Sequence, residues 1–318
     1  MINIKNAFAN FLTFCKVQKN LSEKTLKAYS IDTKQFLEFL AAYENVADVQ
    51  DISKEILRDF LQLLSEKYKI KTVKRKIACL KAFFNYLEFE DIIAVSPFRK
   101  LRIKLKVPFY LPMVMTLNEI ERLFKTAYGL LDGANERAYK YKSIVRDIAV
   151  MELLFATGLR VSELCNLKKN EIDIGNGYVK VSGKGNKERV IFIGNDEVKN
   201  ALSAYASAFT DEIKNSDYFF INRLHVRLSE QSVRFMVNKY AKMVGFEKHI
   251  TPHAFRHSFA TLLLEEGVDI KYIQNFLGHS SIMTTQIYTH VNRGKQKEIL
   301  TSKHPRGNFM AKKRVNEG

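Results

Sequence analysis

Residues 156–164 read ATGLRVSEL, and the same half of the chain holds three more distinctive segments: SGKGNKERV (182–190), TPHAFRHSFAT (251–261) and LGHSSIMTTQIYTHV (277–291). Their polar side chains are of the kinds that bind phosphate, move protons or act as an oxygen nucleophile. The candidate catalytic residues are Arg160, Lys184, His253, Arg256, His279 and Tyr288. The segments contain no carboxylate cluster, no Cys/His metal spacing and no P-loop, so we expect neither a metal ion nor another cofactor.

This residue set suits the transfer of a phosphoryl group without a metal ion. An arginine side chain grips phosphate oxygens with two parallel hydrogen bonds, and two arginines can neutralise the charge that grows around the phosphorus. A tyrosine is an oxygen nucleophile, a lysine can give a proton to the leaving hydroxyl, and histidines can bind the phosphate or take the tyrosine proton. Each residue by itself would more often be structural, so the prediction rests on the whole set.

The net charge of the chain indicates a polyanionic partner. The 318 residues include 51 Lys and Arg against 34 Asp and Glu, which gives +17 at pH 7. The excess is +7 over residues 1–105 and +10 over the remainder, so it is not confined to one end. DNA or RNA bound by both halves is the partner that fits best.

Residues 1–105 show the apolar spacing of a helical domain. We expect helices that begin near Ser22, over 53–64 and over 73–89, the last of them capped by Thr72. The basic stretch 98–106 (FRKLRIKLK) and the prolines on either side favour an extended linker. We therefore divide the chain into a helical domain (1–105), a linker (106–115), a second domain (116–300) and a polar, basic tail (301–318).

The second domain is predicted to be mainly helical with a small antiparallel sheet. Thr116 and Glu119 have the spacing of a capping box, and the apolar run 143–155 predicts a helix. Residues 178–181 alternate between polar and apolar, a glycine-containing turn follows, and 190–193 pairs back as a second strand. Further helices are expected over 196–209 and through most of 229–300.

A basic cluster lies on and around the predicted helix 73–89. Its members are Lys71, Lys74, Arg75, Lys76 and Lys81. Such a run is often only a solvated face. In a chain of this charge, contact with a DNA backbone explains it at least as well.

The cysteines and the hydropathy pattern indicate where the protein works. Cys15, Cys79 and Cys165 are odd in number, far apart and surrounded by apolar residues, which predicts reduced core thiols. No apolar run approaches the roughly 20 residues of a membrane helix, and the first residues lack the pattern of a signal peptide. We expect a cytoplasmic protein with no membrane contact.

The four segments resemble the catalytic motifs of the tyrosine recombinase (phage integrase) family, and within it they are most similar to Xer-type site-specific recombinases. The similarity continues in the first domain, where NLSEKTLKAYSIDTKQFLEFL (20–40) and TVKRKIACLKAFFNYL (72–87) resemble the family's SAM-like helical DNA-binding domain. It covers most of residues 1–300. The resemblance implies a two-domain clamp on double-stranded DNA, made of this helical domain and a tyrosine recombinase catalytic domain.

The resemblance also implies a role for each phosphate-binding candidate. Arg160 matches the first catalytic arginine of the family. His253 and Arg256 match its H-x-x-R pair, and His279 matches the histidine of the third motif.

Three further residues receive roles in the same way. Lys184 matches the lysine that acts as a general acid toward the 5′-hydroxyl, and Tyr288 matches the nucleophile that forms a 3′-phosphotyrosine. Glu163 matches an acidic residue of the family, which we take to support the catalytic residues without touching DNA.

A recombinase of this family would cut and rejoin two synapsed DNA sites through a Holliday junction, as a homotetramer or as a heterotetramer with a second recombinase. An Xer-like role predicts resolution of chromosome or plasmid dimers, and so a part in chromosome partition at cell division, with a septal DNA translocase as partner. The alternative is integration and excision of a mobile element, with an excisionase as partner. The segment 127–143 is longer than in standard Xer enzymes, and Phe192 stands where a proline is common, which leaves both roles open.

Two other functions would use part of the same residue set. A type IB topoisomerase has a chemically similar site, but the helical first domain and the C-terminal position of Tyr288 favour a recombinase. A DNA-binding protein that has lost its activity is disfavoured, because all six catalytic positions are filled.

Overall fold

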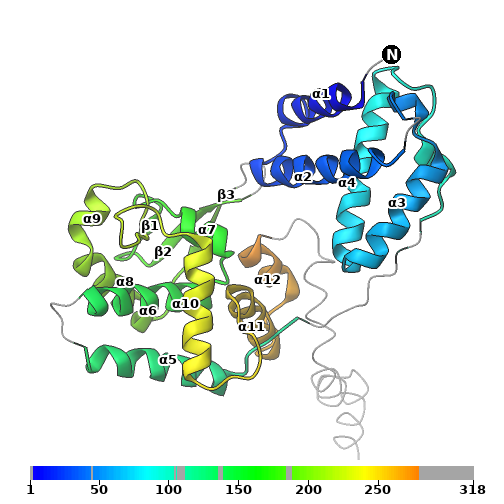
Figure 1. The fold of residues 1–318 in the computed structure, drawn as a ribbon. Coiled ribbons are helices and arrows are strands. Elements are labelled where there is room, and N and C mark those ends of the chain that lie inside the picture. The colour runs from blue at the N-terminus through cyan, green and yellow to red at the C-terminus, as the bar shows by residue number, and fades with distance from the viewer. Residues whose placement is uncertain are drawn as a thin grey trace, which may run out of the picture. The chain divides into compact units, whose positions relative to one another are not determined.

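The computed structural model describes residues 3–43, 46–103, 105, 112–134, 139–183 and 188–278. The chain forms two compact units, Met1–Phe109 and Tyr110–Gly318, which are drawn in Figure 1. The proposed linker 106–115 spans the point where the two units meet in sequence. Each unit has a hydrophobic core of its own and is described by itself.

The first unit is helical, as the sequence predicts. Its helices are α1 (Ile4–Val17), α2 (Glu23–Leu40), α3 (Lys54–Lys67) and α4 (Ile70–Phe89), with 3-10 turns at Val49–Asp51 and Pro97–Lys100. Aromatic rings fill the core, where Phe8 stacks on Phe83 with ring centroids 4.0 Å apart and Phe36 lies 4.8 Å from Phe60. The side chain of Ser22 caps α2 by accepting the Thr25 N–H.

Two local predictions for this unit are wrong. Helix α4 begins at Ile70, three residues before the predicted start, and Lys69 occupies its N-cap without a side-chain hydrogen bond. Thr72 therefore lies inside the first turn and does not cap the helix. The stretch that begins at Phe98 is not extended at its start, because a 3-10 turn places the Phe98 ring in the core, only 7% exposed.

A buried ion cluster joins α2 to α4. The carboxylate of Asp32, 2% exposed, accepts hydrogen bonds from Arg75 and from the ammonium group of Lys76, the latter at 2.9 Å. Lys76 is itself only 3% exposed and also donates to Gln35. Lys76 is therefore not part of the exposed basic surface that the sequence predicts. Four members of the predicted cluster are exposed: Lys71, Lys74, Arg75 and Lys81.

The second unit is mainly helical with a small antiparallel sheet, and this confirms the predicted fold class. Its strands are β1 (Ile172–Asp173), β2 (Tyr178–Ser182) and β3 (Glu188–Phe192), in the order β1-β2-β3, with Tyr178 opposite Phe192 and Ser182 opposite Glu188. Before the sheet come α5 (Leu117–Asp132), α6 (Tyr139–Thr157) and α7 (Val161–Asn166). After it come α8 (Asp196–Ala208), α9 (Thr210–Lys214), α10 (Glu230–Met243), α11 (Pro252–Glu265) and α12 (Ile270–Leu277).

Helix α6 is the centre of this unit, and α5, α8 and α11 pack around it (Figure 1). Val150, Met151, Leu153 and Leu154 are all 0% exposed, so consecutive residues are buried on every side. This explains why apolar residues occur on all sides of the helix, and its two acidic residues, Asp147 and Glu152, are buried as well (5% and 8% exposed). The helix begins four residues before the predicted Ser143, and its last turn leads into the loop that carries Arg160.

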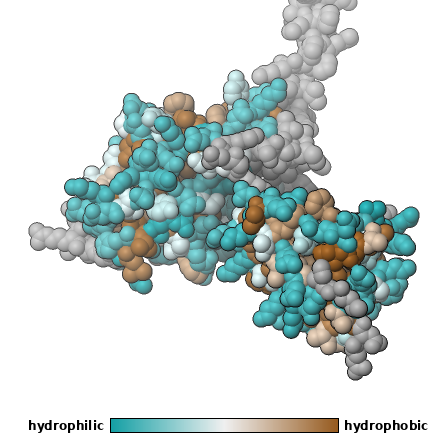
Figure 2. Space-filling model, turned by 90° about the horizontal axis from the view of Figure 1, so that it is seen from above, coloured by the Kyte–Doolittle hydropathy of each residue, from teal (hydrophilic) through white to brown (hydrophobic). Residues whose placement is uncertain are grey.

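Surface and core follow the hydropathy of the sequence. Figure 2 shows hydrophilic side chains over most of the face that it draws, with hydrophobic ones scattered between them. Cys15, Cys79 and Cys165 are buried free thiols, as predicted. Among the described residues, no helix has the length and apolar composition needed to cross a membrane.

The buried ion cluster predicts a large stability difference between two acidic positions on α2. Asp32→Ala leaves the Lys76 ammonium buried without its carboxylate, which typically costs about 3–5 kcal/mol. Glu38→Ala removes an exposed partner of Lys34 at 4.0 Å and should cost about 0.5 kcal/mol or less. Urea unfolding of the first unit, together with hydrogen exchange of the α2 and α4 amides, measures the loss of stability in both variants. Equal losses in the two variants would contradict the importance of the buried pair.

Candidate active site

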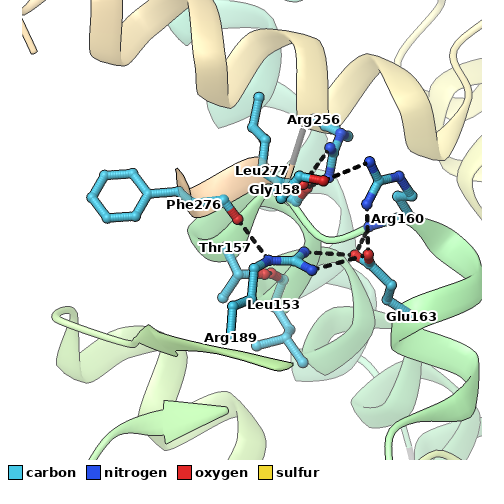
Figure 3. Close-up of polar contacts among 10 residues, drawn as sticks. Leu153, Thr157, Gly158, Arg160, Glu163, Arg189, Arg256, Phe276 and Leu277 are labelled. Carbon is cyan, nitrogen blue, oxygen red and sulfur yellow. Dashed lines mark hydrogen bonds and ion pairs between the residues drawn. The ribbon is translucent and has the colours of Figure 1, made fainter. Parts of the chain in front are cut away.

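Arg256 occupies the buried face of α11 and connects two distant loops. The residue is 4% exposed, and its guanidinium group donates to the Gly158 carbonyl at 2.7 Å and to the Leu277 carbonyl at 2.6 Å (Figure 3). Gly158 follows α6, whereas Leu277 ends α12. The side chain of Arg256 therefore sets the distance between the end of one helix and the end of another.

Arg160 reaches the same place from the start of α7. Its Nη1 donates to Glu163 Oε1 at 2.7 Å and its Nη2 to the Gly278 carbonyl at 3.3 Å. The Glu163 side chain is 7% exposed, and its Oε2 also accepts the Arg160 backbone N–H at 2.9 Å, at the N-terminus of α7. The Arg160 side chain is 35% exposed, so it is the more accessible of the two predicted arginines.

A third arginine, Arg189 on β3, was not predicted as a site residue. Its Nη1 and Nη2 donate to the two oxygens of Glu163 at 3.1 and 2.8 Å, and its Nε donates to the Phe276 carbonyl at 3.0 Å. The sequence carried a signal, because Arg189 stands two residues before Ile191 and so shares the buried face of the strand. A cation on that face needs a partner within the protein.

The three arginines converge on the last turn of α12. Three consecutive carbonyls, those of Phe276, Leu277 and Gly278, accept hydrogen bonds from Arg189, Arg256 and Arg160 respectively (Figure 3). The last carbonyls of a helix have no partner within it, and cations near a helix C-terminus are favoured by the helix dipole. The convergence therefore satisfies the end of α12 and concentrates positive charge immediately before residue 279.

The electrostatics of the site favour an anion as its ligand. Burial alone would raise the pKa of Glu163, but hydrogen bonds from Arg189 and from the Arg160 N–H bring that pKa below its usual value. One ionised carboxylate thus pairs with two of the three guanidinium groups, those of Arg160 and Arg189, and the excess of positive charge suits a phosphate. Loss of hydration, followed by the charges of Arg256, Arg234 and Arg160, lowers the pKa of His253, so its imidazole is neutral at pH 7.

Two glycines allow the backbone to approach these arginines. Gly158 and Gly278 have φ values of +61° and +62°, in the left-handed region that glycine adopts without strain. A Cβ atom on Gly278 would lie 2.9 Å from Arg189 Nη1, and one on Gly158 would lie 2.6 Å from the Phe259 ring. The glycines of the segments ATGLR and LGH are therefore required by packing as well as by backbone conformation.

The structure brings together part of the predicted residue set. Arg160 and Arg256 meet at the end of α12, His253 lies one turn before Arg256 on α11, and Glu163 contacts Arg160. Lys184, His279 and Tyr288 lie outside the described residues. His257 lies one turn after His253 on α11, and their ring centroids are 6.4 Å apart.

Family comparisons agree with this architecture over both units. The model of the phage integrase family matches residues 113–295, and that of the phage integrase N-terminal SAM-like domain matches residues 8–91. The chain therefore belongs to the phage integrase family, the tyrosine recombinases. This confirms the family resemblance of the sequence motifs.

The similarity to curated relatives extends over nearly the whole chain. A tyrosine recombinase of Agathobacter rectalis is 46% identical over 97% of this chain and 99% of its own. The tyrosine recombinase XerC of Thermodesulfovibrio yellowstonii is 37% identical, with 96% and 98% covered, and XerD of Halalkalibacterium halodurans is 35% identical, with 96% and 100% covered. Xer-type enzymes are thus among its close relatives.

Solved structures share the fold. XerH bound to its palindromic difH substrate superposes with a TM-score of 0.71 at 22% identity, covering 93% of this chain and 85% of that one. A lambda integrase tetramer bound to a Holliday junction gives a TM-score of 0.67 at 18% identity, covering 90% and 77%. The predicted pairing of a SAM-like helical domain with a catalytic domain is confirmed.

The geometry at Gly278 predicts a difference between two helix-ending glycines. Gly267, after α11, also has a positive φ (+85°), but a Cβ there meets nothing within 4 Å. Gly267→Ala should cost about 1–2 kcal/mol through backbone strain alone. Gly278→Ala should cost about 1–3 kcal/mol more, because it also displaces Arg189. Thermal or urea unfolding of the second unit measures both, and equal destabilisation would show that Arg189 does not need the space.

Proposed function

We propose that this chain breaks and rejoins DNA at a specific site, with Tyr288 as the nucleophile. The observation that carries the proposal is the convergence of Arg160 and Arg256 on the end of α12, directly before the segment that contains His279 and Tyr288. Two guanidinium groups at one place provide a binding site for a single phosphodiester. Homology to tyrosine recombinases over nearly the full chain supports the same reading.

The proposed reaction exchanges one phosphodiester for another. The phenol oxygen of Tyr288 attacks the scissile phosphorus, and the bond between phosphorus and the 5′-oxygen breaks. Lys184 gives a proton to the departing 5′-oxygen, and His253, neutral at pH 7, takes the phenol proton. A 5′-hydroxyl from another strand then returns its proton to Lys184 and attacks the 3′-phosphotyrosine, and Tyr288 leaves and regains its proton from His253.

The arginines stabilise the phosphorus centre in both steps. Negative charge grows on the non-bridging oxygens as the fifth bond forms, and fixed guanidinium groups compensate for it without reorganising. Because the phosphodiester energy is kept in the tyrosine bond, the exchange consumes no nucleotide. His279 is proposed as a further hydrogen-bond donor to the phosphate, as the family motif implies.

The biological setting that we propose is Xer-like. Four protomers would synapse two double-stranded sites, exchange strands through a Holliday junction and resolve chromosome or plasmid dimers in the cytoplasm, under the control of a septal DNA translocase. Relatives named XerC and XerD at 35–37% identity favour this role. Integration of a mobile element, with an excisionase, remains the second candidate because of the long segment 127–143.

A covalent-adduct experiment tests the nucleophile. On a nicked suicide substrate carrying the target site, the wild type should accumulate a covalent protein–DNA adduct that survives denaturation. Tyr288→Phe should abolish the adduct, since phenylalanine has no attacking oxygen, whereas Tyr272→Phe should retain it. Tyr272 is a suitable control because it lies on α12 and is 62% exposed. An adduct that persists in Tyr288→Phe would overturn the assignment.

The exposed basic residues of α4 are proposed to contact the DNA backbone. Lys71, Lys74, Arg75 and Lys81 lie on the surface of the first unit. Each lysine that neutralises one phosphate releases counterions, so the logarithm of the affinity should fall with the logarithm of salt concentration by about 0.9 per contact.

A salt titration of DNA binding tests this surface. Lys71→Gln, Lys74→Gln and Lys81→Gln should each weaken binding and lower the salt slope by about 0.9. Lys54→Gln, which removes an exposed partner of Glu55 on α3, serves as the control and should leave the slope unchanged. If the salt slope changed equally in all four variants, including the control, the α4 surface would not be the specific site of DNA contact.

A further inference from the structure

We infer that Arg189 is a positioning residue of the recombination site, which holds Arg160 ready for the phosphate by occupying Glu163. The inference rests on the proposed function and deepens it, since it names a residue that neither the motif chemistry nor the family roles singled out. Arg189 touches no reacting atom in this proposal. It acts through the carboxylate that it shares with Arg160.

The sharing of Glu163 is the first observation. Its Oε1 accepts from Arg160 Nη1 at 2.7 Å and from Arg189 Nη1 at 3.1 Å. Its Oε2 accepts from the Arg160 backbone N–H at 2.9 Å and from Arg189 Nη2 at 2.8 Å. The Arg189 fork thus uses both oxygens, and only one side-chain hydrogen bond is left for Arg160. The Arg160 guanidinium keeps its other donors for a ligand.

Removal of Arg189 would change what Arg160 does. With Arg189 absent, each oxygen of a carboxylate that is 7% exposed would lose one of its two hydrogen bonds and keep only the bond from Arg160. The Arg160 fork is the nearest cation and matches a carboxylate with two parallel hydrogen bonds. It would turn toward Glu163 and lose its orientation toward the phosphate.

The contact with α12 is the second observation. Through Nε, Arg189 also holds the Phe276 carbonyl, two residues before Gly278, whose own carbonyl accepts from Arg160. One side chain on β3 therefore fixes Glu163 on α7 and the end of α12 at the same time. Lysine donates from a single nitrogen and lacks the planar fork that binds both oxygens of Glu163 in parallel while Nε reaches the Phe276 carbonyl.

The environment of Arg189 suits positioning, because Nε, Nη1 and Nη2 all donate to the Phe276 carbonyl or to Glu163. Its side chain is 14% exposed, against 35% for Arg160. The absence of a Cβ on Gly278 leaves the space that the guanidinium group fills. Of the two cations on Glu163, the buried one anchors the carboxylate and the accessible one faces outward.

A double-mutant cycle tests the inference. Single-turnover adduct formation is measured at saturating enzyme for the wild type, Arg160→Ala, Arg189→Gln and the double variant. Arg189→Gln should slow cleavage by about 10²-fold with DNA affinity nearly unchanged, because a misplaced catalytic group costs about that much. In the Arg160→Ala background the same change should alter the rate by less than about threefold, since the residue it positions is gone. Arg189→Lys should also be slowed at least about tenfold, because it keeps the charge but not the fork.

Arg146→Gln is the matched control for a merely structural effect. The Arg146 side chain is 13% exposed and pairs with Asp147, itself 7% exposed, in the same unit but at another place. It should destabilise the fold without slowing cleavage more than about threefold below its unfolding transition.

The outcomes separate the two proposals. Absence of an adduct with the wild type would overturn the proposed function and the inference with it. An adduct with the wild type, combined with independent losses from Arg160→Ala and Arg189→Gln, would overturn the inference alone. A loss in Arg146→Gln as large as that in Arg189→Gln would do the same, because it would show that burial of any such ion pair is enough.

Discussion

The second unit depends on one constraint, the need to satisfy the end of α12. Three consecutive carbonyls there have no partner within the helix, and three arginines from three other elements provide it. Their guanidinium groups repel one another, and this repulsion is offset by the carbonyl dipoles and by the buried carboxylate of Glu163, which pairs with Arg160 and Arg189. The same arrangement creates a strongly positive place next to the motif that contains Tyr288.

Both units present cations in the same way. In the first unit, Asp32 is buried and binds Lys76, also buried, together with Arg75, whose side chain is 42% exposed. In the second unit, Glu163 is buried and binds Arg189 together with the more accessible Arg160. The attraction between a buried carboxylate and a buried cation offsets part of their desolvation cost, and the fixed carboxylate sets the geometry of the outer cation. In each unit the buried carboxylate therefore holds an accessible arginine in one orientation. A surface arginine without such a partner would move freely.

Family membership and geometry answer different questions. The matches to tyrosine recombinases establish the class of chemistry. They do not indicate how Arg160 is held, because that depends on a strand residue outside the predicted set. The hydrogen bonds of Arg189 supply this link, and they show why β3 has to lie against the end of α12.

The sequence by itself determined the class of fold, the family and most of the candidate residues. Helical periodicity, the capping box at Thr116 and the alternation over 178–181 are patterns between residues close together in the chain, so they can be recognised in the sequence alone. Only the tertiary structure decided which charged residues face inward. Lys76 was expected at the surface and is buried on Asp32, whereas Arg189 was overlooked and joins three elements. The physical reason is that the partner of a buried charge lies far away in sequence. Asp32 is 44 residues from Lys76, and Glu163 is 26 residues from Arg189. No local sequence pattern can predict such a pair.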